Sequence, residues 1–582
     1  MNFIILNKTL DLTKRVFDKN TATDPIIPFV AQKPKCPTGK VVNPLPRCMP
    51  EKEGISSRYI ASFLRELKDD KSIDMHDVII IRNGKILCEC AFGLQDLTVW
   101  KTTFSACKSI TSLAIGMLVD DGLLSVTDKM SRLFDDKMQP LSYVTMKDLT
   151  VRDVLTMTSG VVFNEATCMT ETDWSKGFMN SIVIGEMSKT FNYNSLNTYM
   201  LAVLVKRLTG KTMSEFLSER LFTPLGITEY FWEKSPEGVE KGGWGLYIKP
   251  EDEAKIGIMI LQKGVWNGTR IVSEKWIEDA TARQVPAPKD YGVFDYGYQI
   301  WSGRYENSFL FNGMLGQNLL GFKDSGILIV SNAGNEELFQ QSNYFNIVRK
   351  YFAKSFGFSI DEDLSGYEDM LRTVRSMSYY PQCHHRRTFR DLFTKKTAEL
   401  PQEHVLTLNR IWKTQSSGFS VGLMPVLWQM VTNNYTKGLK SISFAVADGT
   451  YYMNYRENDC SFSVPVGLSA PERFSLTFHG ETYECASIGT FSKDEDGNTV
   501  LKVNIAFLEI PCTRKIKIYF KPDHILYKSV ESPGADFIVQ NVLERKQAAK
   551  GNKMIAPFLS RLEDDYLEYK IRSVFEPEIK LF

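Results

Sequence analysis

A serine and a lysine three residues apart are the residues of this chain whose types and spacing favour covalent chemistry. Ser105 and Lys108 precede an apolar run, residues 110–119, that predicts a long buried helix. Positions three apart share one face of a helix, so the lysine amine would lie beside the serine hydroxyl. A serine is a poor nucleophile unless a neighbouring base takes its proton. A lysine in a poorly hydrated pocket has a lowered pKa and can act as that base.

Two later segments carry further candidate site residues. Tyr193 stands on a predicted loop before the apolar stretch 199–205, where a tyrosine hydroxyl can reach into a cleft and relay a proton. Gly313 precedes a strand-like run, residues 326–331. Glycine beside a strand edge allows backbone N–H groups to approach a substrate closely. These segments are therefore further candidates for a site.

The order of these segments resembles the serine β-lactamase and penicillin-binding protein superfamily, whose first motif is Ser-x-x-Lys. The most similar branch is the class C β-lactamase-related hydrolases, which include esterases and D-amino-acid peptidases. The resemblance extends over about residues 50–355. Further landmarks match the family in order; they are the predicted hairpin 78–85, the segment 149–160 (similar to the family's LLTHTSGL), and the segments 221–227, 243–247 and 296–301.

The resemblance implies a serine hydrolase. Ser105 would attack an ester or amide carbonyl, while Lys108 and Tyr193 together accept its proton and pass it to the leaving group. Water would then hydrolyse the acyl-serine, without a metal or an organic cofactor. Backbone N–H groups of Ser105 and a second residue would hold the oxyanion. Three residues are expected to bind the substrate or the oxyanion: Ser195, Gly313 and Met314. The expected partner is a small-molecule or peptide substrate.

Two departures from the family pattern bear on the substrate. The second motif is usually Tyr-x-Asn, but Ser195 takes the place of the amide side chain here. The third motif usually begins with lysine, histidine or tryptophan, but here it reads Phe311-Asn312-Gly313. A substrate carboxylate would lose a charge-assisted contact of about 1.5–3 kcal/mol. An esterase, amidase or peptidase is therefore favoured over a true β-lactamase. The alternative is a catalytically silent binding or regulatory protein on the same fold.

Histidine-based sites are less favoured. The chain has six histidines: His76, His384, His385, His404, His479 and His524. Only His76 lies in the candidate catalytic region, where it precedes a strand, so a Ser-His-Asp triad would need a base from elsewhere in the chain. Cys383, His384 and His385, with His404 downstream, raise the alternative of a metal site. Adjacent histidines in a basic connector are more often solvated, so no metal is expected.

The length of 582 residues predicts at least two hydrophobic cores. Helices between early and late strands predict that both ends of the hydrolase domain build one antiparallel sheet. The resemblance implies the β-lactamase/transpeptidase-like fold, an α/β sandwich of an antiparallel sheet with helices and an all-helical insertion. Alternating strands around the hairpin turn Asp448-Gly449 predict a C-terminal antiparallel β-barrel or sandwich. We expect four parts: a proline-rich arm (1–50), a hydrolase domain (51–358), a connector (359–410) and a β-rich domain (411–582).

Composition limits the partners and the location. A net charge of +1 gives no electrostatic reason to expect nucleic acid or an anionic membrane surface. No segment approaches the ~20 apolar residues of a membrane-spanning helix. The N-terminus has only a four-residue apolar run, residues 3–6, too short for a secretory signal. We expect a cytoplasmic protein whose ten cysteines are reduced. The sequence does not indicate what the β-rich domain binds.

Overall fold

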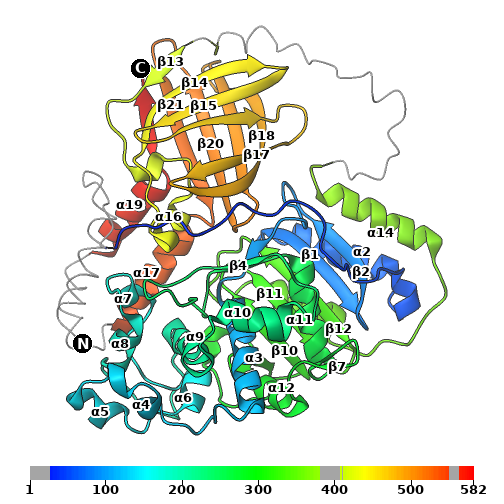
Figure 1. Cartoon of the computed structure of the whole chain (residues 1–582). Coiled ribbons are helices and arrows are strands. Elements are labelled where there is room, and N and C mark those ends of the chain that lie inside the picture. The colour runs from blue at the N-terminus through cyan, green and yellow to red at the C-terminus, as the bar shows by residue number, and fades with distance from the viewer. Residues whose placement is uncertain (1–26, 381–406, 409, 550–562) are drawn as a thin grey trace. The chain divides into compact units, whose positions relative to one another are not determined.

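The structure is a computed structural model that describes residues 27–380, 407–408, 410–549 and 563–582 (Figure 1). The described chain divides into two compact units. Unit 1 consists of residues 32–91 and 96–377. Unit 2 contains the described residues from 378 to the C-terminus and two short segments, 27–31 and 92–95.

Unit 1 is built around a seven-stranded antiparallel sheet with the order β2-β1-β12-β11-β10-β9-β8. Its strands are β1 (Met75–Arg82), β2 (Lys85–Ala91), β8 (Phe294–Tyr296), β9 (Trp301–Gly303), β10 (Ser308–Gly313), β11 (Gln317–Phe322) and β12 (Ile327–Ala333). Strand β1 pairs with β12 so that Ile79 faces Val330. The first strands of the unit thus lie beside its last ones, which confirms the prediction that early and late segments share one sheet.

Helices pack on this sheet because doing so buries the apolar face of each helix. Helix α2 (Ser57–Asp69) buries Phe63, whose ring lies 4.9 Å from that of Phe352 in α13 (Tyr344–Phe352). Helix α14 (Leu364–Met377) also packs on α2. Helix α11 (Pro250–Leu261) packs on β11 and β12. The result is an α/β sandwich, as the resemblance implies.

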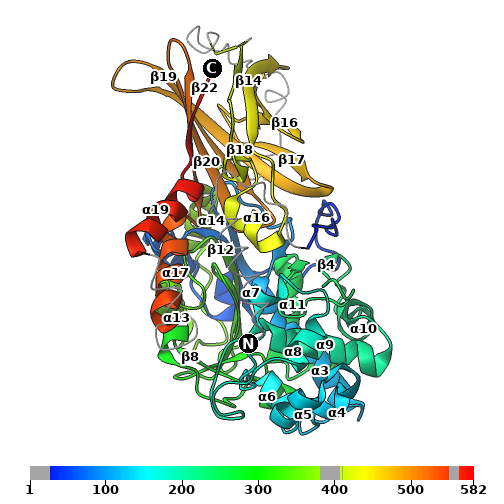
Figure 2. The ribbon, with the colours of Figure 1, turned by 90° about the vertical axis from the view of Figure 1, so that its left-hand side faces the viewer.

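The middle of unit 1 is helical and lies together on one side of the seven-stranded sheet (Figures 1 and 2). Its helices are α3 (Cys107–Asp120), α4 (Met130–Leu133), α5 (Pro140–Met146), α6 (Val151–Leu155), α7 (Glu165–Cys168), α8 (Trp174–Met179), α9 (Ser195–Thr209), α10 (Met213–Leu217) and α12 (Glu274–Thr281). A small sheet joins β3 (Lys101–Thr102), which precedes α3 in the chain, to β5 (Leu246–Ile248) and β4 (Tyr230–Trp232), which follow α10. Between β3 and β4 every element is a helix, as expected for the helical insertion.

Buried helices pass through the centre of this region. Residues 107–118 of α3 are all buried, as are residues 195–205 of α9, and the two helices contact each other. A helix that is apolar on every side has to lie inside the domain. Helix α3 also contacts β10 and the turn before it, so the sheet and the helical region meet at the N-terminus of α3. Ser105 lies in that turn.

Unit 2 contains two antiparallel sheets. The first has the order β13 (Ile411–Lys413), β14 (Leu439–Ala447), β15 (Thr450–Glu457) and β16 (Ser461–Val466). The second has the order β17 (Glu472–Phe478), β18 (Glu481–Lys493), β19 (Thr499–Phe507), β20 (Cys512–Phe520), β21 (Ile525–Ser532) and β22 (Glu578–Leu581). Neither strand order closes into a ring, so the barrel alternative is corrected to two open sheets. Lys413 and Phe582 still exchange two backbone hydrogen bonds, 2.7 and 2.8 Å long, between the sheet edges.

A buried ion pair anchors the segment before β14 inside unit 2. Arg514 on β20 donates to Glu531 on β21 at 2.7 Å, and both side chains are buried. Glu531 also accepts the backbone N–H groups of Val426 and Leu427 at the start of α16 (Val426–Thr432). Helices α17 (Ala535–Ala549) and α19 (Asp564–Phe575) lie between β21 and β22 in sequence.

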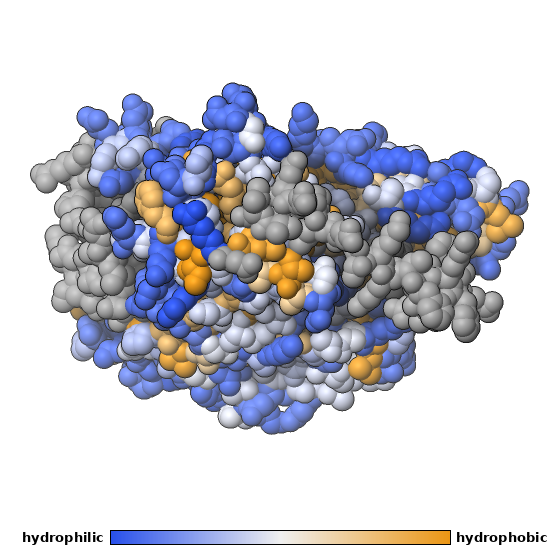
Figure 3. Space-filling model, turned by 90° about the horizontal axis from the view of Figure 1, so that it is seen from above, coloured by the Kyte–Doolittle hydropathy of each residue, from blue (hydrophilic) through white to orange (hydrophobic). Residues whose placement is uncertain are grey.

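No helix in the described ranges is both long and apolar enough to cross a bilayer. On the face seen in Figure 3, hydrophilic side chains predominate and apolar side chains form small separate patches. Scattered apolar side chains are normal on a folded protein and need no partner.

Candidate active site

Ser105 lies in a single 3₁₀ turn, Phe104–Ala106, directly before α3. Phe104 has φ of +44°, a left-handed conformation that is strained for a bulky residue. Strain of this kind persists where the surroundings impose it, and it is concentrated at functional sites. The imposing neighbour is β10: a Cβ built at Gly313 would lie 2.3 Å from the carbonyl oxygen of Thr103. Only glycine permits the strand to approach the turn of Ser105 this closely.

The Lys108 amine lies between Ser105 and Gly243. Its Nζ is 2.8 Å from Ser105 Oγ and 2.7 Å from the carbonyl oxygen of Gly243. A carbonyl oxygen only accepts hydrogen bonds, so one N–H of the amine is committed to Gly243. The side chain is 1% exposed, and this burial lowers the lysine pKa to about 8. A neutral amine at this distance can accept the proton of the serine hydroxyl.

Tyr193 lies beside the other two side chains. The centre of its ring lies 5.0 Å from Lys108 Nζ, and its hydroxyl is close enough to Ser105 for the serine side chain to lower the tyrosine pKa against the larger effect of burial. Burial raises the tyrosine pKa far above its usual value, so the phenol keeps its proton at neutral pH. A neutral phenol can donate to Ser105 Oγ while the serine donates to the lysine.

The loop that carries Tyr193 is fixed by the residue that follows it. Asn194 caps α9: its side-chain oxygen accepts the Leu196 N–H at 2.9 Å. Its side-chain nitrogen donates to the carbonyl oxygens of Val161 and Phe163, both at 2.9 Å. These three hydrogen bonds hold Asn194 at the start of α9 and against the loop that contains Val161 and Phe163. They therefore fix the direction in which Tyr193 leaves the helix.

Aromatic rings surround the tyrosine. Trp301 is stacked on it with ring centres 6.0 Å apart, and Phe339 meets it edge-on at 5.0 Å. Tyr291 and Tyr296 follow at 6.2 and 6.3 Å. Aromatic contacts of this type restrict the ring to one orientation. They also provide an apolar wall beside the hydroxyl of Ser105.

The residues expected to bind substrate or oxyanion lie around this group. Ser195 is the first residue of α9, and its backbone N–H donates to Glu165 Oε1 at 2.8 Å. Gly313 ends β10 against Thr103, as described above. Met314 is half-buried and follows Gly313 in the turn to β11. The geometry brings Ser105, Lys108 and Tyr193 into direct contact; it places the other three nearby without assigning them a role.

Two contributors to the site were missed in the sequence. Gly243 supplies a carbonyl oxygen from a loop, and carbonyls carry no residue signature. Its segment, 243–247, was nevertheless among the family landmarks. Glu165 receives the Ser195 N–H, and its negative charge raises the Lys108 pKa against the larger effect of burial. No motif marks Glu165, because it lies on a separate short helix, α7.

The residues of the alternative histidine-based sites lie away from Ser105 or outside the described residues. His76 is buried on β1, where its Nε2 lies close to Gly334, and burial lowers its pKa to about 4. Phe311 is 0% exposed, and its ring lies 6.1 Å from that of Phe309. The third motif therefore begins with a core side chain. The histidines His384, His385 and His404, with Cys383, are outside the described residues.

Comparison with known proteins shows which families and proteins the chain is similar to. Residues 60–333, somewhat less than half of the chain, match the model of the Beta-lactamase family. Curated relatives include the 6-aminohexanoate-dimer hydrolase of Paenarthrobacter ureafaciens, which is 25% identical over 229 residues, covering 35% of this chain and 56% of the relative. Penicillin-binding protein 4* of Bacillus subtilis is 22% identical over 218 residues (32% and 47%). Lovastatin esterase of Penicillium rubens is 28% identical over 190 residues (28% and 46%).

The chain spans about half the length of these curated relatives. A similar solved structure is the putative 6-aminohexanoate-dimer hydrolase from Bacillus anthracis, with a TM-score of 0.44 and 15% identity; it covers 55% of this chain and 89% of that chain. The octameric penicillin-binding protein homologue from Pyrococcus abyssi has a TM-score of 0.39 and 14% identity over 81% of this chain and 96% of that chain.

The fold and the Ser-x-x-Lys site define a β-lactamase/transpeptidase-like domain. The part of the chain that matches the Beta-lactamase family model contains this site, and the curated relatives to which the chain is similar include a hydrolase, a penicillin-binding protein and an esterase.

Proposed function

We propose that the chain is a serine hydrolase that cleaves an ester or amide bond through an acyl-serine at Ser105. The observation that carries the proposal is the 2.8 Å contact between Ser105 Oγ and the buried Lys108 Nζ. A pKa of about 8 leaves part of the lysine neutral at physiological pH. A neutral amine at this distance can remove the serine proton.

The proposed reaction begins with proton transfer from Ser105 Oγ to Lys108 Nζ as the oxygen attacks the carbonyl carbon. The developing oxyanion is held by backbone N–H groups, for which we propose those of Ser105 and Met314. Tyr193 carries the proton from the lysine side of the site to the leaving group, which departs as an alcohol or amine. Water then attacks the acyl-serine, returns a proton to the same groups and releases the acid.

The aromatic side chains around Tyr193 and the lack of a cation in the third motif support an apolar substrate without a carboxylate next to the scissile bond. Trp301, Phe339 and Tyr291 present ring surfaces around Tyr193. Phe311 stands where a cation would hold a substrate carboxylate, and it is buried. We therefore expect p-nitrophenyl esters to be turned over faster than nitrocefin, which carries a carboxylate beside its lactam. The proposal leaves ester, amide and peptide substrates to be distinguished by assay.

One observation favours the alternative, a binding protein without activity. The amide of the usual Tyr-x-Asn motif is replaced by Ser195, so the site lacks a side-chain donor that the resemblance leads one to expect. A protein that has lost turnover while keeping its cleft would show the same change. The two functions differ in whether Ser105 is reactive.

The test is hydrolysis of p-nitrophenyl acetate by the full chain and by two serine variants. Ser105→Ala should abolish the reaction above background. Ser112→Ala is the matched control: it changes a buried serine on α3 whose hydroxyl has no hydrogen-bond partner within the described part of the chain. The control should keep wild-type activity. Equal activity of Ser105→Ala and wild type would refute the proposal, and inactive but folded wild type would favour the binding protein.

A further inference from the structure

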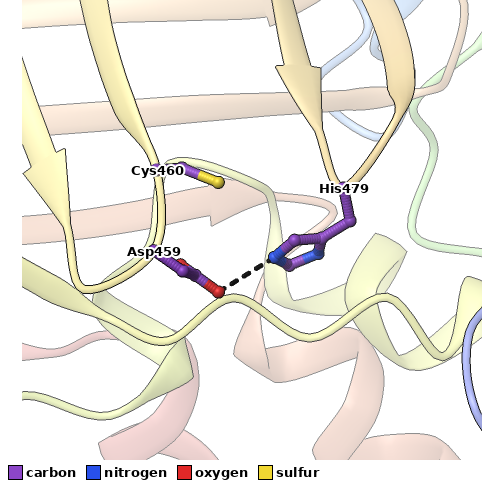
Figure 4. A group of neighbouring side chains, drawn as sticks. All are labelled: Asp459, Cys460 and His479. Carbon is purple, nitrogen blue, oxygen red and sulfur yellow. Dashed lines mark hydrogen bonds and ion pairs between the residues drawn. The ribbon is translucent and has the colours of Figure 1, made fainter.

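Unit 2 contains a group of three side chains with the ligand types that zinc prefers. Asp459 and Cys460 lie in the turn between β15 and β16, and His479 lies in the turn between β17 and β18 (Figure 4). A carboxylate oxygen, the cysteine sulfur and an imidazole nitrogen all lie within 4.8 Å of one another. Sulfur, imidazole nitrogen and carboxylate oxygen are the donors of protein zinc sites.

A buried asparagine fixes which nitrogen of His479 is free to bind. Asn434 is 0% exposed, and its Oδ1 lies 2.5 Å from His479 Nδ1. The amide nitrogen of Asn434 faces the carbonyl oxygen of Phe478 at 3.5 Å, which orients the amide oxygen toward the ring. Nδ1 must therefore carry the proton and donate it to Asn434. In neutral histidine this leaves Nε2 with a lone pair, the arrangement seen when a second-sphere acceptor orients a metal-binding imidazole.

The lone pair of Nε2 is directed at an acceptor rather than a donor. Asp459 Oδ2 lies 3.0 Å from Nε2 (dashed line in Figure 4). A carboxylate and a neutral imidazole nitrogen repel at this distance unless a cation stands between them. Either a proton or a metal ion fills that role. Zinc bonds of about 2.0–2.2 Å to nitrogen and oxygen at a tetrahedral angle place the two atoms about 3.3–3.5 Å apart, so this pair would open by a few tenths of an ångström to hold the ion.

The nearby sulfur of Cys460 favours a metal ion over a proton as the cation between His479 and Asp459. A histidine–aspartate ion pair needs no third partner, and the pair formed by His524 and Asp523 elsewhere in unit 2 belongs to no such group of three among the described residues. In Figure 4 the Cys460 sulfur points toward the His479 ring. The sulfur therefore lies where it can become a third ligand of an ion held by His479 and Asp459.

We propose that Asp459 Oδ2, Cys460 Sγ and His479 Nε2 bind one Zn²⁺ ion, with a water molecule as the fourth ligand. Binding would displace the thiol proton to solvent and leave a zinc thiolate. Tetrahedral zinc requires ligand atoms about 3.3–3.6 Å apart, so the sulfur moves inward by about 1 Å from the present spacing. The side chains of His479 and Asp459 are 28% and 31% exposed, which leaves a path for the ion.

The position of this site indicates what the ion does. The turn of Asp459 and Cys460 belongs to the four-stranded sheet, and the turn of His479 belongs to the six-stranded sheet. Strand β16 contacts β17 and β18 across the junction of the two sheets. Zinc bound here would join the sheets at the ends of two hairpins. The proposed zinc ion stabilises the structure of unit 2, and this role is independent of the proposed hydrolase activity.

Titration of the reduced, chelator-treated full chain with Co²⁺ tests the proposal. We expect one equivalent to bind with a near-ultraviolet thiolate-to-metal charge-transfer band, and Zn²⁺ to displace it. Cys460→Ser should abolish the band, and His479→Gln should weaken metal binding at least tenfold, consistent with loss of a ligand. Zn²⁺ should raise the unfolding temperature of wild type and leave that of Cys460→Ser unchanged, because a ligand stabilises only the state that binds it.

Two controls make the result specific. His524→Gln removes the comparable histidine–aspartate pair that lacks a thiol neighbour, and it should bind Co²⁺ like wild type. A variant with Cys383→Ser, His384→Gln and His385→Gln should also keep the band. Absence of a thiolate band in wild type would overturn the proposal. So would a band that survives in folded Cys460→Ser or disappears in the Cys383 variant, because the metal would then be bound elsewhere.

Discussion

The carbonyl oxygen of Gly243 accepts a hydrogen bond from Lys108 Nζ at 2.7 Å, although the two residues are 135 positions apart in the chain. This contact holds the amine beside Ser105 Oγ, where neutral Lys108 can accept the serine proton. The loop of Gly243 is thus part of the machinery that positions the proposed base. It touches neither the nucleophile nor, in the proposed reaction, the substrate.

Substitution of Gly243 by alanine should disturb the base without removing it. A Cβ at this position would lie 2.9 Å from the Ser195 carbonyl oxygen and 3.4 Å from Lys108 Nζ. The loop must therefore shift, and a displacement of about 1 Å at a catalytic group can cost about 100-fold in rate. We expect Gly243→Ala to lower kcat with p-nitrophenyl acetate by about 10- to 100-fold.

Gly357→Ala is the matched control for this experiment. A Cβ at Gly357 would meet only the carbonyl oxygen of Ser359, at an ordinary 3.8 Å, and its φ is not left-handed. Its kcat should equal that of wild type. If Gly243→Ala were equally active while folded, the carbonyl contact would have no role in orienting Lys108.

Replacement of Lys108 separates its charge from its basicity. Lys108→Arg keeps a cation but cannot supply a base, since guanidinium stays protonated. Lys108→Met keeps most of the volume and removes the amine. Both variants should lose activity nearly as completely as Ser105→Ala, because groups that act as a unit have non-additive effects. Steady-state kinetics would measure this, and an active arginine variant would rule out Lys108 as the proton acceptor.

The pH dependence of kcat/KM should report the lysine. Burial lowers the Lys108 pKa to about 8, and only the neutral amine accepts the serine proton. Activity should therefore rise tenfold per pH unit below about 8 and level off above it. The pKa of Tyr193 is raised, so the phenol should not ionise on this plateau. A rise in kcat/KM with an apparent pKa near 6.5 would indicate a histidine base instead.

Tyr193→Phe should remove proton relay while keeping the ring contacts. The phenylalanine ring can still stack on Trp301 and meet Phe339, so the pocket should stay filled. Loss of the hydroxyl should lower kcat by about 10²- to 10⁴-fold, the usual contribution of general acid–base catalysis. Tyr305→Phe, which changes an exposed tyrosine, serves as the control. Unchanged kcat in Tyr193→Phe would assign the relay to another group.

Local signals made parts of the fold predictable. The turn Asp448-Gly449 joins β14 to β15, where Ala447 pairs with Thr450, because both turn residues adopt positive φ. The alternation of polar and apolar residues predicted β19 and β20 in the same way. Ser105 and Lys108 were predicted to meet because a helix fixes contacts three positions apart.

Contacts between distant segments could not be predicted from one sequence. The Lys108–Gly243 bond and the Ser195–Glu165 bond depend on how loops fold back, and neither involves a motif. The same holds for His479, which reaches Asp459 only because two hairpin turns lie at the junction of two sheets. Phe311 was read as an open motif position, but its ring lies in the core of the sheet.

The buried ion pair of unit 2 gives a prediction about stability. Glu531→Gln would leave Arg514 charged and fully buried without its carboxylate. Breaking such a pair from one side costs about 3–5 kcal/mol. Chemical denaturation followed by circular dichroism should therefore show early unfolding of the β-rich region. Lys528→Met removes an exposed pair with Glu578 and should cost about 0–1 kcal/mol. Equal stability of the two variants would contradict this account.

The most direct measurement of the central claim is covalent labelling of the full chain with a fluorophosphonate, followed by peptide mass spectrometry. The account predicts one adduct, on the peptide that contains Ser105, formed by wild type and by Ser112→Ala. Ser105→Ala should carry no adduct, and Lys108→Met should react at least 100-fold more slowly, because its serine lacks a base. An adduct on another residue, or no adduct on folded wild type, would contradict the assignment of Ser105 as the nucleophile.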